Sequence, residues 1–144
     1  MHGSKESPSW FLWVHLFMNL FMIIPFGCIL ESKTGSKNTL IVVLSAIIFS
    51  SITFQILLSG KDEMATGISV VGYAFVAGGT LNLIQSWTTY SKKFKNVCII
   101  LCVLDVLMLF PMMTGWVSTC LHISGIVSYF FVYFIMKLLA HLKK

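Results

Sequence analysis

Five runs of apolar residues, separated by short polar segments, account for most of the chain. Each run approaches the roughly 20 residues that a helix needs to cross about 30 Å of hydrocarbon. None alternates as membrane β-strands do, and backbone groups in lipid must be bonded within a helix or a closed barrel. The pattern predicts an all-α, polytopic transmembrane helical bundle. Its single domain covers residues 1–144, with five spans at about residues 9–30, 39–58, 65–87, 97–113 and 117–139.

The composition and charge agree with an integral membrane protein. Apolar residues make up 57% of the chain and charged residues 10%, far below the quarter or so that is usual in soluble domains. The net charge of +5 comes from lysines in alternate loops and at or beyond the end of the last span, which predicts a cytoplasmic C-terminus and an external N-terminus. We therefore expect anionic lipid rather than nucleic acid as the electrostatic partner. These lysines are Lys33, Lys37, Lys92, Lys93, Lys95, Lys137, Lys143 and Lys144.

Four polar side chains share one depth in this topology. Ser69 in the third span and His122 in the fifth lie about one turn below the outer surface, and His15 and Asn19 lie one to three turns below it in the first. His15 and Asn19 are four residues apart and so share a helix face. Polar groups inside a membrane normally face the bundle interior or a water-filled cavity, and tend to mark function.

This set of side chains contains the parts of a serine hydrolase. Ser69 and His122 can form a nucleophile and base pair, and His15, Asn19 and the Ser69 amide can stabilise an oxyanion. Gly67 allows close backbone approach before the serine, and Tyr73, one turn after it, can pack on whatever Ser69 contacts. Each residue also has an ordinary structural explanation, as a helix-packing or interhelical hydrogen-bonding group. Their common layer in three helices favours a site.

These residues resemble the motifs of the rhomboid family of intramembrane serine proteases. They read HLFMN at residues 15–19, GIS at 67–69 followed by Tyr73, and HISG at 122–125. The segment FGCILESKTGS at residues 26–36 is similar to the family's second-helix exit. The resemblance covers residues 10–139 and begins at what looks like the second of six core helices, so the first core helix is expected to be absent.

The resemblance implies a protease that cleaves transmembrane segments of membrane proteins without a metal or cofactor. It implies a nucleophile at Ser69, a base at His122 stacked by Tyr73, and oxyanion donors at His15 and Asn19. Two positions depart from the family pattern. Val70 follows the nucleophile where glycine is usual, and Tyr129 stands four residues after the HISG glycine where a small residue is expected.

Two alternative functions stay open at this point. A rhomboid-like pseudoprotease would bind transmembrane helices without cutting them, and Val70 favours that interpretation. A small transporter or channel would use Asp105, a carboxyl expected near the middle of the fourth span, although a bonded or protonated structural role is preferred for it. The chain contains no HExxH, CxxC or Walker motif, and Cys98 and Cys102 are interpreted as packing residues.

Overall fold

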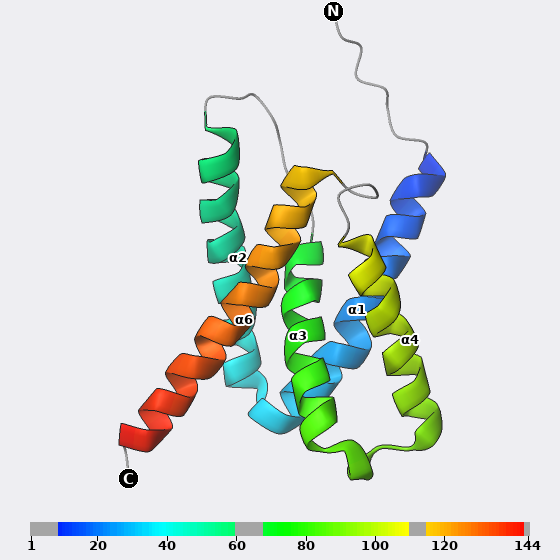
Figure 1. Cartoon of the computed structure of the whole chain (residues 1–144), viewed down its shortest axis with the longest axis vertical. Coiled ribbons are helices and arrows are strands. Elements are labelled where there is room, and N and C mark those ends of the chain that lie inside the picture. The colour runs from blue at the N-terminus through cyan, green and yellow to red at the C-terminus, as the bar shows by residue number, and fades with distance from the viewer. Residues whose placement is uncertain (1–8, 60–67, 110–114, 143–144) are drawn as a thin grey trace, which may run out of the picture.

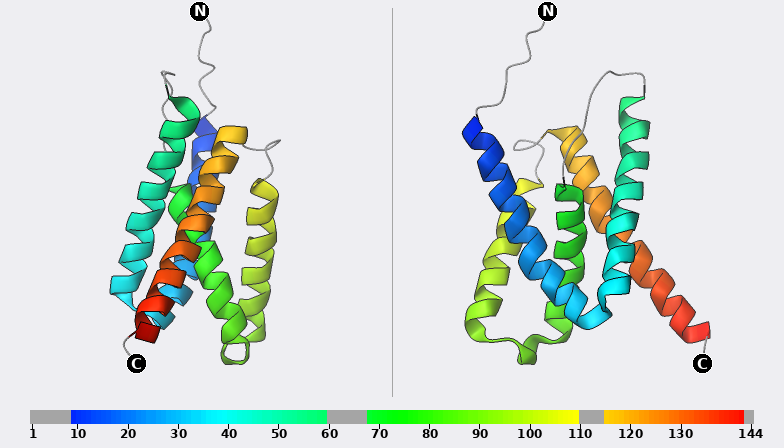
Figure 2. Two further views of the ribbon diagram at one scale, coloured as in Figure 1. Left: turned by 60° about the vertical axis from the view of Figure 1, so that its left-hand side comes forward. Right: turned by 180° about the vertical axis from the view of Figure 1, so that it is seen from behind.

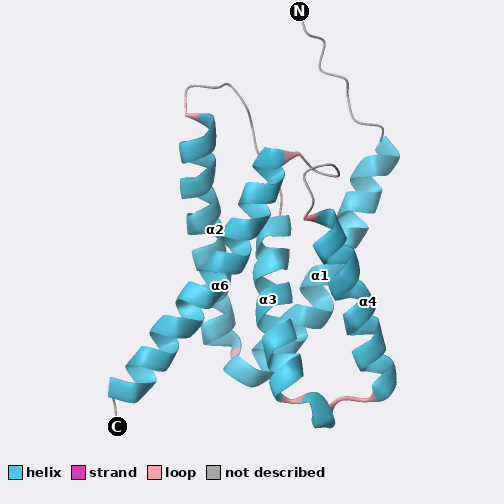
Figure 3. Cartoon of the chain, viewed as in Figure 1, coloured by secondary structure: helices cyan, strands magenta, loops and turns pink. Residues whose placement is uncertain are grey.

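The computed structural model describes residues 9–59, 68–109 and 115–142, and all regular secondary structure in these ranges is helical (Figure 3). The predicted all-α bundle is confirmed. In chain order the elements are α1 (Ser9–Thr34), α2 (Ser36–Leu58), α3 (Ser69–Gln85), the short 3₁₀ helix η1 (Trp87–Thr89), α4 (Lys92–Met108) and α6 (Trp116–Leu142).

The helices differ in length more than the apolar runs predict. Among the described residues, three helices, α1, α2 and α6, are long and apolar enough to cross a membrane. The third and fourth, α3 and α4, have 17 residues each, which corresponds to about 25 Å. The span predicted at 65–87 is therefore longer than α3 as described, whereas the span predicted at 97–113 has the same number of residues as α4. The fourth is also displaced, because α4 runs from Lys92 to Met108.

The displacement of α4 has a local cause at its first turn. Ser91 has an extended backbone and its side-chain oxygen accepts a hydrogen bond from the backbone N–H of Phe94 at 3.3 Å. A serine in this position satisfies one of the N–H groups that lack an intrahelical partner, so the helix begins at Lys92. The lysines of this segment are thus part of α4 and not of a preceding loop.

Helix α3 is the centre of the bundle. Helices α1, α3 and α6 run in one direction and α2 and α4 in the other, so the start of α1 and the end of α6 lie at opposite ends (Figures 1 and 2). Helix α3 packs most extensively against α1 and α6, whereas α4 contacts α1 and α3 over smaller areas. Every residue of α3 from Ser69 to Phe75 is buried. The first turns of α3 are therefore enclosed by protein.

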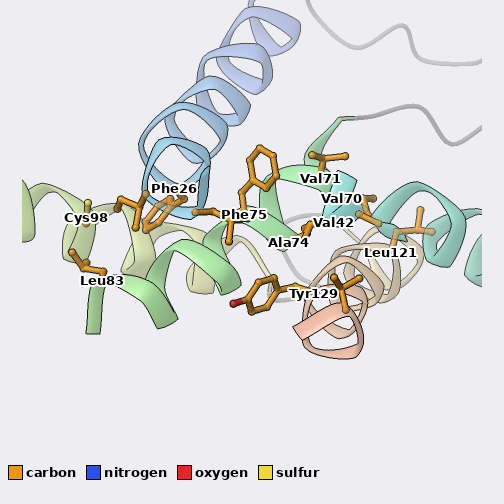
Figure 4. Packing of buried hydrophobic residues seen from close by; sticks show 14 residues of the cluster. Phe26, Val42, Val70, Val71, Ala74, Phe75, Leu83, Cys98, Leu121 and Tyr129 are labelled. Atoms are coloured by element: carbon orange, nitrogen blue, oxygen red, sulfur yellow. The ribbon is translucent and has the colours of Figure 1, made fainter. Parts of the chain in front are cut away.

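The apolar core lies where α3 meets its neighbours. Phe26 of α1 and Phe75 of α3 lie close together, while Tyr129 of α6 lies below them and Leu121 lies on the side of Val70 and Val42 (Figure 4). The outer faces of α2 and α6 carry many exposed large apolar side chains. In a membrane protein such faces contact lipid, so the core is small and the remaining apolar surface is solvated by the bilayer.

Glycines allow the backbones of α1 and α6 to approach α3 closely. A methyl group at Gly79 would lie 2.8 Å from the Cα of Phe26 in α1, and one at Gly125 would collide with the backbone carbonyl of Val70 in α3. Small residues at such crossings are typical of membrane helix packing. The approach at Gly125 determines how closely α6 lies to the beginning of α3, where Ser69 is located.

Candidate active site

Ser69 and His122 are brought together by the contact between α3 and α6. Ser69 is the first residue of α3, and His122 lies in the second turn of α6. His122 Nε2 lies 3.2 Å from Ser69 Oγ, within hydrogen-bond distance, and each residue is only 7% exposed. The start of α3 is recessed below the adjacent ends of α2 and α6 (Figure 1). The pair therefore lies inside the bundle.

Tyr73 holds the histidine from one side. It lies one turn after Ser69 on α3, and its ring stacks on the His122 imidazole with centroids 4.3 Å apart and planes at 27°. Its hydroxyl donates a hydrogen bond to the backbone carbonyl of Asp105 in α4, at 3.0 Å. The predicted packing position of Tyr73 thus places its ring between the pair and the fourth helix.

The imidazole has no carboxylate partner among the residues that the structure describes. The Nδ1 atom of His122 is buried and has no hydrogen-bond partner in this part of the chain. In serine hydrolases with a third member, an acidic side chain at this nitrogen orients the ring. Here the Ser69 hydroxyl and the Tyr73 ring contact the imidazole instead. Among the described residues the arrangement is therefore a pair rather than a triad.

Helix α1 brings Asn19 to the same level. A methyl group at Gly72 would lie 3.2 Å from the Cε of Met22, and α1 and α3 run in the same direction. Asn19 and Ser69 each lie three residues before this contact, so the two side chains occupy equivalent levels. Asn19 is 3% exposed, and its buried Oδ1 has no hydrogen-bond partner within the described segments.

His15 and Gly67 complete the predicted set with different outcomes. His15 lies one turn before Asn19 on α1 and is exposed at its own position. Gly67 lies outside the described residues. Of the six predicted site residues, the structure therefore gathers Ser69, Tyr73, His122 and Asn19 in one layer, with His15 beside it.

The start of α3 supplies N–H donors at this layer. The first hydrogen bond of the helix runs from the Gly72 N–H to the Ile68 carbonyl, at 3.1 Å. The N–H groups of Ser69 and Val70 come earlier and have no acceptor within the described part of the helix. Together with the positive end of the helix dipole they favour negative charge beside the Ser69 hydroxyl. The described residues include no cluster of three His, Cys, Asp or Glu side chains that could hold a metal ion.

A hydroxyl bonded to an imidazole, next to N–H donors at a helix start, is the arrangement of an acyl-transfer site. The family is shown by the whole sequence, which matches the Rhomboid domain over residues 9–138. The chain belongs to the rhomboid family. Searches of curated proteins and of solved structures gave no match. Rhomboid proteins are integral membrane proteins, and they include intramembrane proteases and pseudoproteases.

Val70 and Tyr129, the two departures from the rhomboid pattern, are both accommodated by glycines on the facing helix. Val70 is buried with Gly125 of α6 against its carbonyl, and the ring of Tyr129 lies over Gly78 of α3, 2.6 Å from where a methyl group would be. Val70 and Tyr129 therefore each lie next to a glycine, which has no side chain. With glycines at these two contacts, α3 and α6 lie close enough for the Ser69 hydroxyl to contact His122 in this rhomboid chain.

Asp105 is the residue whose place sequence reasoning missed. We expected it near the middle of the fourth span, but α4 ends at Met108, so Asp105 lies in the last turn, where its backbone carbonyl accepts the hydrogen bond from Tyr73. The N-cap serine at residue 91 is the signal that would have shown this. A helix beginning at Lys92 with about 17 residues places Asp105 next to its end.

Proposed function

We propose that this rhomboid protein is an intramembrane serine protease. Ser69 is the nucleophile and His122 its base, and the substrate is a peptide bond in or near a transmembrane segment of another membrane protein. The observation that carries the proposal is the 3.2 Å separation between Ser69 Oγ and His122 Nε2, with the imidazole stacked on Tyr73. A serine becomes nucleophilic at neutral pH when a base lies within hydrogen-bond reach.

The proposed reaction has two halves. Ser69 Oγ attacks the carbonyl carbon of the peptide bond while His122 Nε2 takes the hydroxyl proton. The C–N bond then breaks, and His122 returns that proton to the leaving amine. In the second half His122 takes a proton from water, the hydroxide attacks the ester carbon, and the proton returns to Ser69 as the acid leaves.

The oxyanion formed in each half needs donors that are already in place. The Ser69 N–H lies at the start of α3 and has no acceptor among the described residues of this helix. Asn19 lies at the level of Ser69, and His15 lies one turn before it on α1. Removal of one such donor in a serine protease lowers kcat by about 10²- to 10³-fold. We assign this role to the Ser69 amide, Asn19 and His15.

The lysine distribution supports an orientation with the pair near the outer surface. The α1–α2 turn, the start of α4 and the end of α6 lie at the end of the bundle opposite to the first turn of α3 (Figure 1). Cytoplasmic segments carry an excess of lysine. We therefore propose an external N-terminus and a cytoplasmic C-terminus. The described lysines of this end are Lys33, Lys37, Lys92, Lys93, Lys95 and Lys137.

A pseudoprotease that binds transmembrane helices without cutting them is the alternative. Val70 favours it, because its side chain adds bulk where the third span packs against the fifth. Gly125 lies directly against the Val70 backbone, so α6 stays close to α3 despite the valine side chain. The contact between Ser69 and His122 supports the protease instead.

Cleavage of a model transmembrane substrate tests the proposal. The wild-type protein in proteoliposomes should release a fragment, and Ser69→Ala and His122→Ala should each abolish the release. The double variant should be no slower than either single variant, because the two residues act as a unit. Additive losses would contradict the assignment of the pair. Absence of cleavage by folded wild-type protein against a panel of substrates would favour the pseudoprotease.

A further inference from the structure

The lysine-rich end of the bundle, opposite to Ser69, contains a crevice that the proposed reaction does not use. Helices α2 and α6 cross near their middles and diverge toward this end (Figures 1 and 2). The crevice lies between them, with the last turns of α1 as its third wall, and encloses about 230 Å³ including the space at its open side. Its lining includes Thr34, Asn38, Val42, Val132, Tyr133 and Met136.

The crevice favours an apolar occupant. The buried side chains of Val42 and Val132 form its floor, and the surface that lines it is apolar. The polar side chains at its edge are already bonded to the backbone. Thr34 Oγ1 donates to the Leu30 carbonyl at 2.9 Å, and Asn38 Nδ2 donates to the Thr34 carbonyl at 2.7 Å. An apolar crevice does not hold ordered water, and the medium around these helices is hydrocarbon. A lipid acyl chain therefore fits it better than a polar ligand.

The crevice reaches from the membrane interior to the edge of the hydrocarbon. Along α6 it extends from Tyr129 to Met136, about 10 Å at the usual rise per residue. One leaflet contributes about 15 Å of hydrocarbon, so a chain in the crevice lies along most of the leaflet. On α2 the crevice begins at Asn38, in the first turn of the helix. The headgroup of a lipid held there lies beside the turn that joins α1 to α2.

The charge at this edge of the crevice is positive. Lys33 and Lys37 are exposed on the two sides of the α1–α2 turn, each next to a lining residue along the chain. Lys137 Nζ lies over the ring of Tyr133, 5.0 Å from its centroid, on the α6 wall. In the described parts of these three helices Glu31 is the one acid. Three lysines against one carboxylate are complementary to a phosphate group.

We propose that the crevice binds one anionic phospholipid. One acyl chain lies between α2 and α6, and the phosphate lies beside Lys37 and Lys137. The chain fills the space where the two helices diverge, and the phosphate joins a lysine of α2 to a lysine of α6. A lipid bound in this way stabilises the folded bundle. The site is remote from Ser69, so it can be tested whether or not Ser69 is a nucleophile.

The first test removes the charge at the crevice. The full chain in detergent is titrated with phosphatidylglycerol, and the lipid retained is counted by native mass spectrometry. Wild type should retain one lipid, and Lys37→Gln with Lys137→Gln should bind it about 30-fold more weakly, at about fivefold per lysine. Lys92→Gln with Lys93→Gln is the matched control, because it removes the same charge at the start of α4, on the other side of α3 (Figure 1).

The control variant should stay within about threefold of wild type, because its lysines are away from the crevice. Equal weakening by both pairs would show a general attraction of lysines for anionic lipid and would overturn the site. Equal binding of phosphatidylcholine would overturn the role of the charge. Equal competition by glycerol phosphate, which has the headgroup without the chains, would show a phosphate site instead. A dimer without retained lipid would show that a second copy covers the crevice.

The second test blocks the space for the chain. Met136→Trp places a large ring in the crevice and should abolish retention of the lipid. Ile135→Trp makes a similar change at the neighbouring exposed position of α6 and should retain it. Retention by a folded Met136→Trp variant, or loss in both variants, would contradict the assignment of the chain to the crevice.

A third measurement uses the wild-type chain and so does not depend on the folding of a variant. Phosphatidylglycerol with a photoreactive diazirine in one acyl chain is incorporated into phosphatidylcholine nanodiscs. Its crosslinks on α6 should concentrate at Tyr133 and Met136, which line the crevice, over Phe134 and Leu138, which are exposed on the same helix. Crosslinks concentrated at the exposed pair, or spread evenly over all four, would overturn the inference.

Discussion

The contact between Gly125 and Val70 makes the separation of α3 and α6 sensitive to a single methyl group. A methyl group on Gly125 would collide with the Val70 carbonyl oxygen, and it would lie 3.1 Å from the Val70 Cγ1. The first obstacle is backbone and cannot move by rotating a side chain. Gly125→Ala therefore has to push α6 away from the first turn of α3, where Ser69 lies.

The size of the effect follows from this geometry. Overpacking of this kind costs about 1 to 3 kcal/mol, which corresponds to a fall in melting temperature of roughly 2 to 12 °C. A displacement of about 1 Å in a catalytic group costs about a hundredfold in rate. Since the Ser69–His122 separation is already 3.2 Å, we expect Gly125→Ala to lower the cleavage rate by about that factor.

The assay measures cleavage and thermal unfolding of Gly125→Ala and Gly78→Ala in the same detergent. Gly78→Ala is the matched control, because its methyl group would meet the Tyr129 ring, which can turn, about 13 Å along α3 from Ser69. It should lose stability but keep the rate within a few-fold of wild type. A destabilised Gly125→Ala variant that cleaves at the wild-type rate would refute the reasoning. Equal losses of cleavage rate in both variants would refute it too.

Three further outcomes are expected. Val70→Gly should leave a void against α6 and lower the melting temperature without raising the cleavage rate, and a gain in both would contradict the packing described. Asn19→Ala should reduce kcat by about 10²-fold or more while changing stability little, because the buried Asn19 Oδ1 has no partner in the described part of the chain; a stability loss without a rate loss would make Asn19 structural. Lys93→Cys should react with an impermeant thiol reagent only from the cytoplasmic side, and labelling from outside intact cells would reverse the orientation.

The polar layer could be predicted from the sequence because the depth of a residue in the membrane depends only on its position along its own helix. Once the spans and their directions are assigned, the number of residues from the surface places Ser69, Asn19 and His122 at similar heights. Lateral proximity does not follow from depth. It depends on which helices touch, and Gly125 against the Val70 carbonyl brings α6 to Ser69.

The position of α4 could not be read from hydrophobicity alone. The apolar run begins after the lysines, but the N-cap at Ser91 starts the helix before them, since lysine is a good helix former near an aqueous surface. The sequence also did not show which glycines make room for Val70 and Tyr129. It pairs positions far apart in sequence, and only the contact between α3 and α6 shows that Gly125 and Gly78 face them.

The most direct test of the account is whether Ser69 is a reactive nucleophile in the folded protein. Membranes containing the wild-type chain are treated with a fluorophosphonate probe, and the labelled residue is identified by mass spectrometry. The account predicts labelling at Ser69 that is lost in His122→Ala, because the imidazole activates the hydroxyl. Folded wild-type protein that is not labelled at Ser69, or labelling that persists unchanged in His122→Ala, would contradict it.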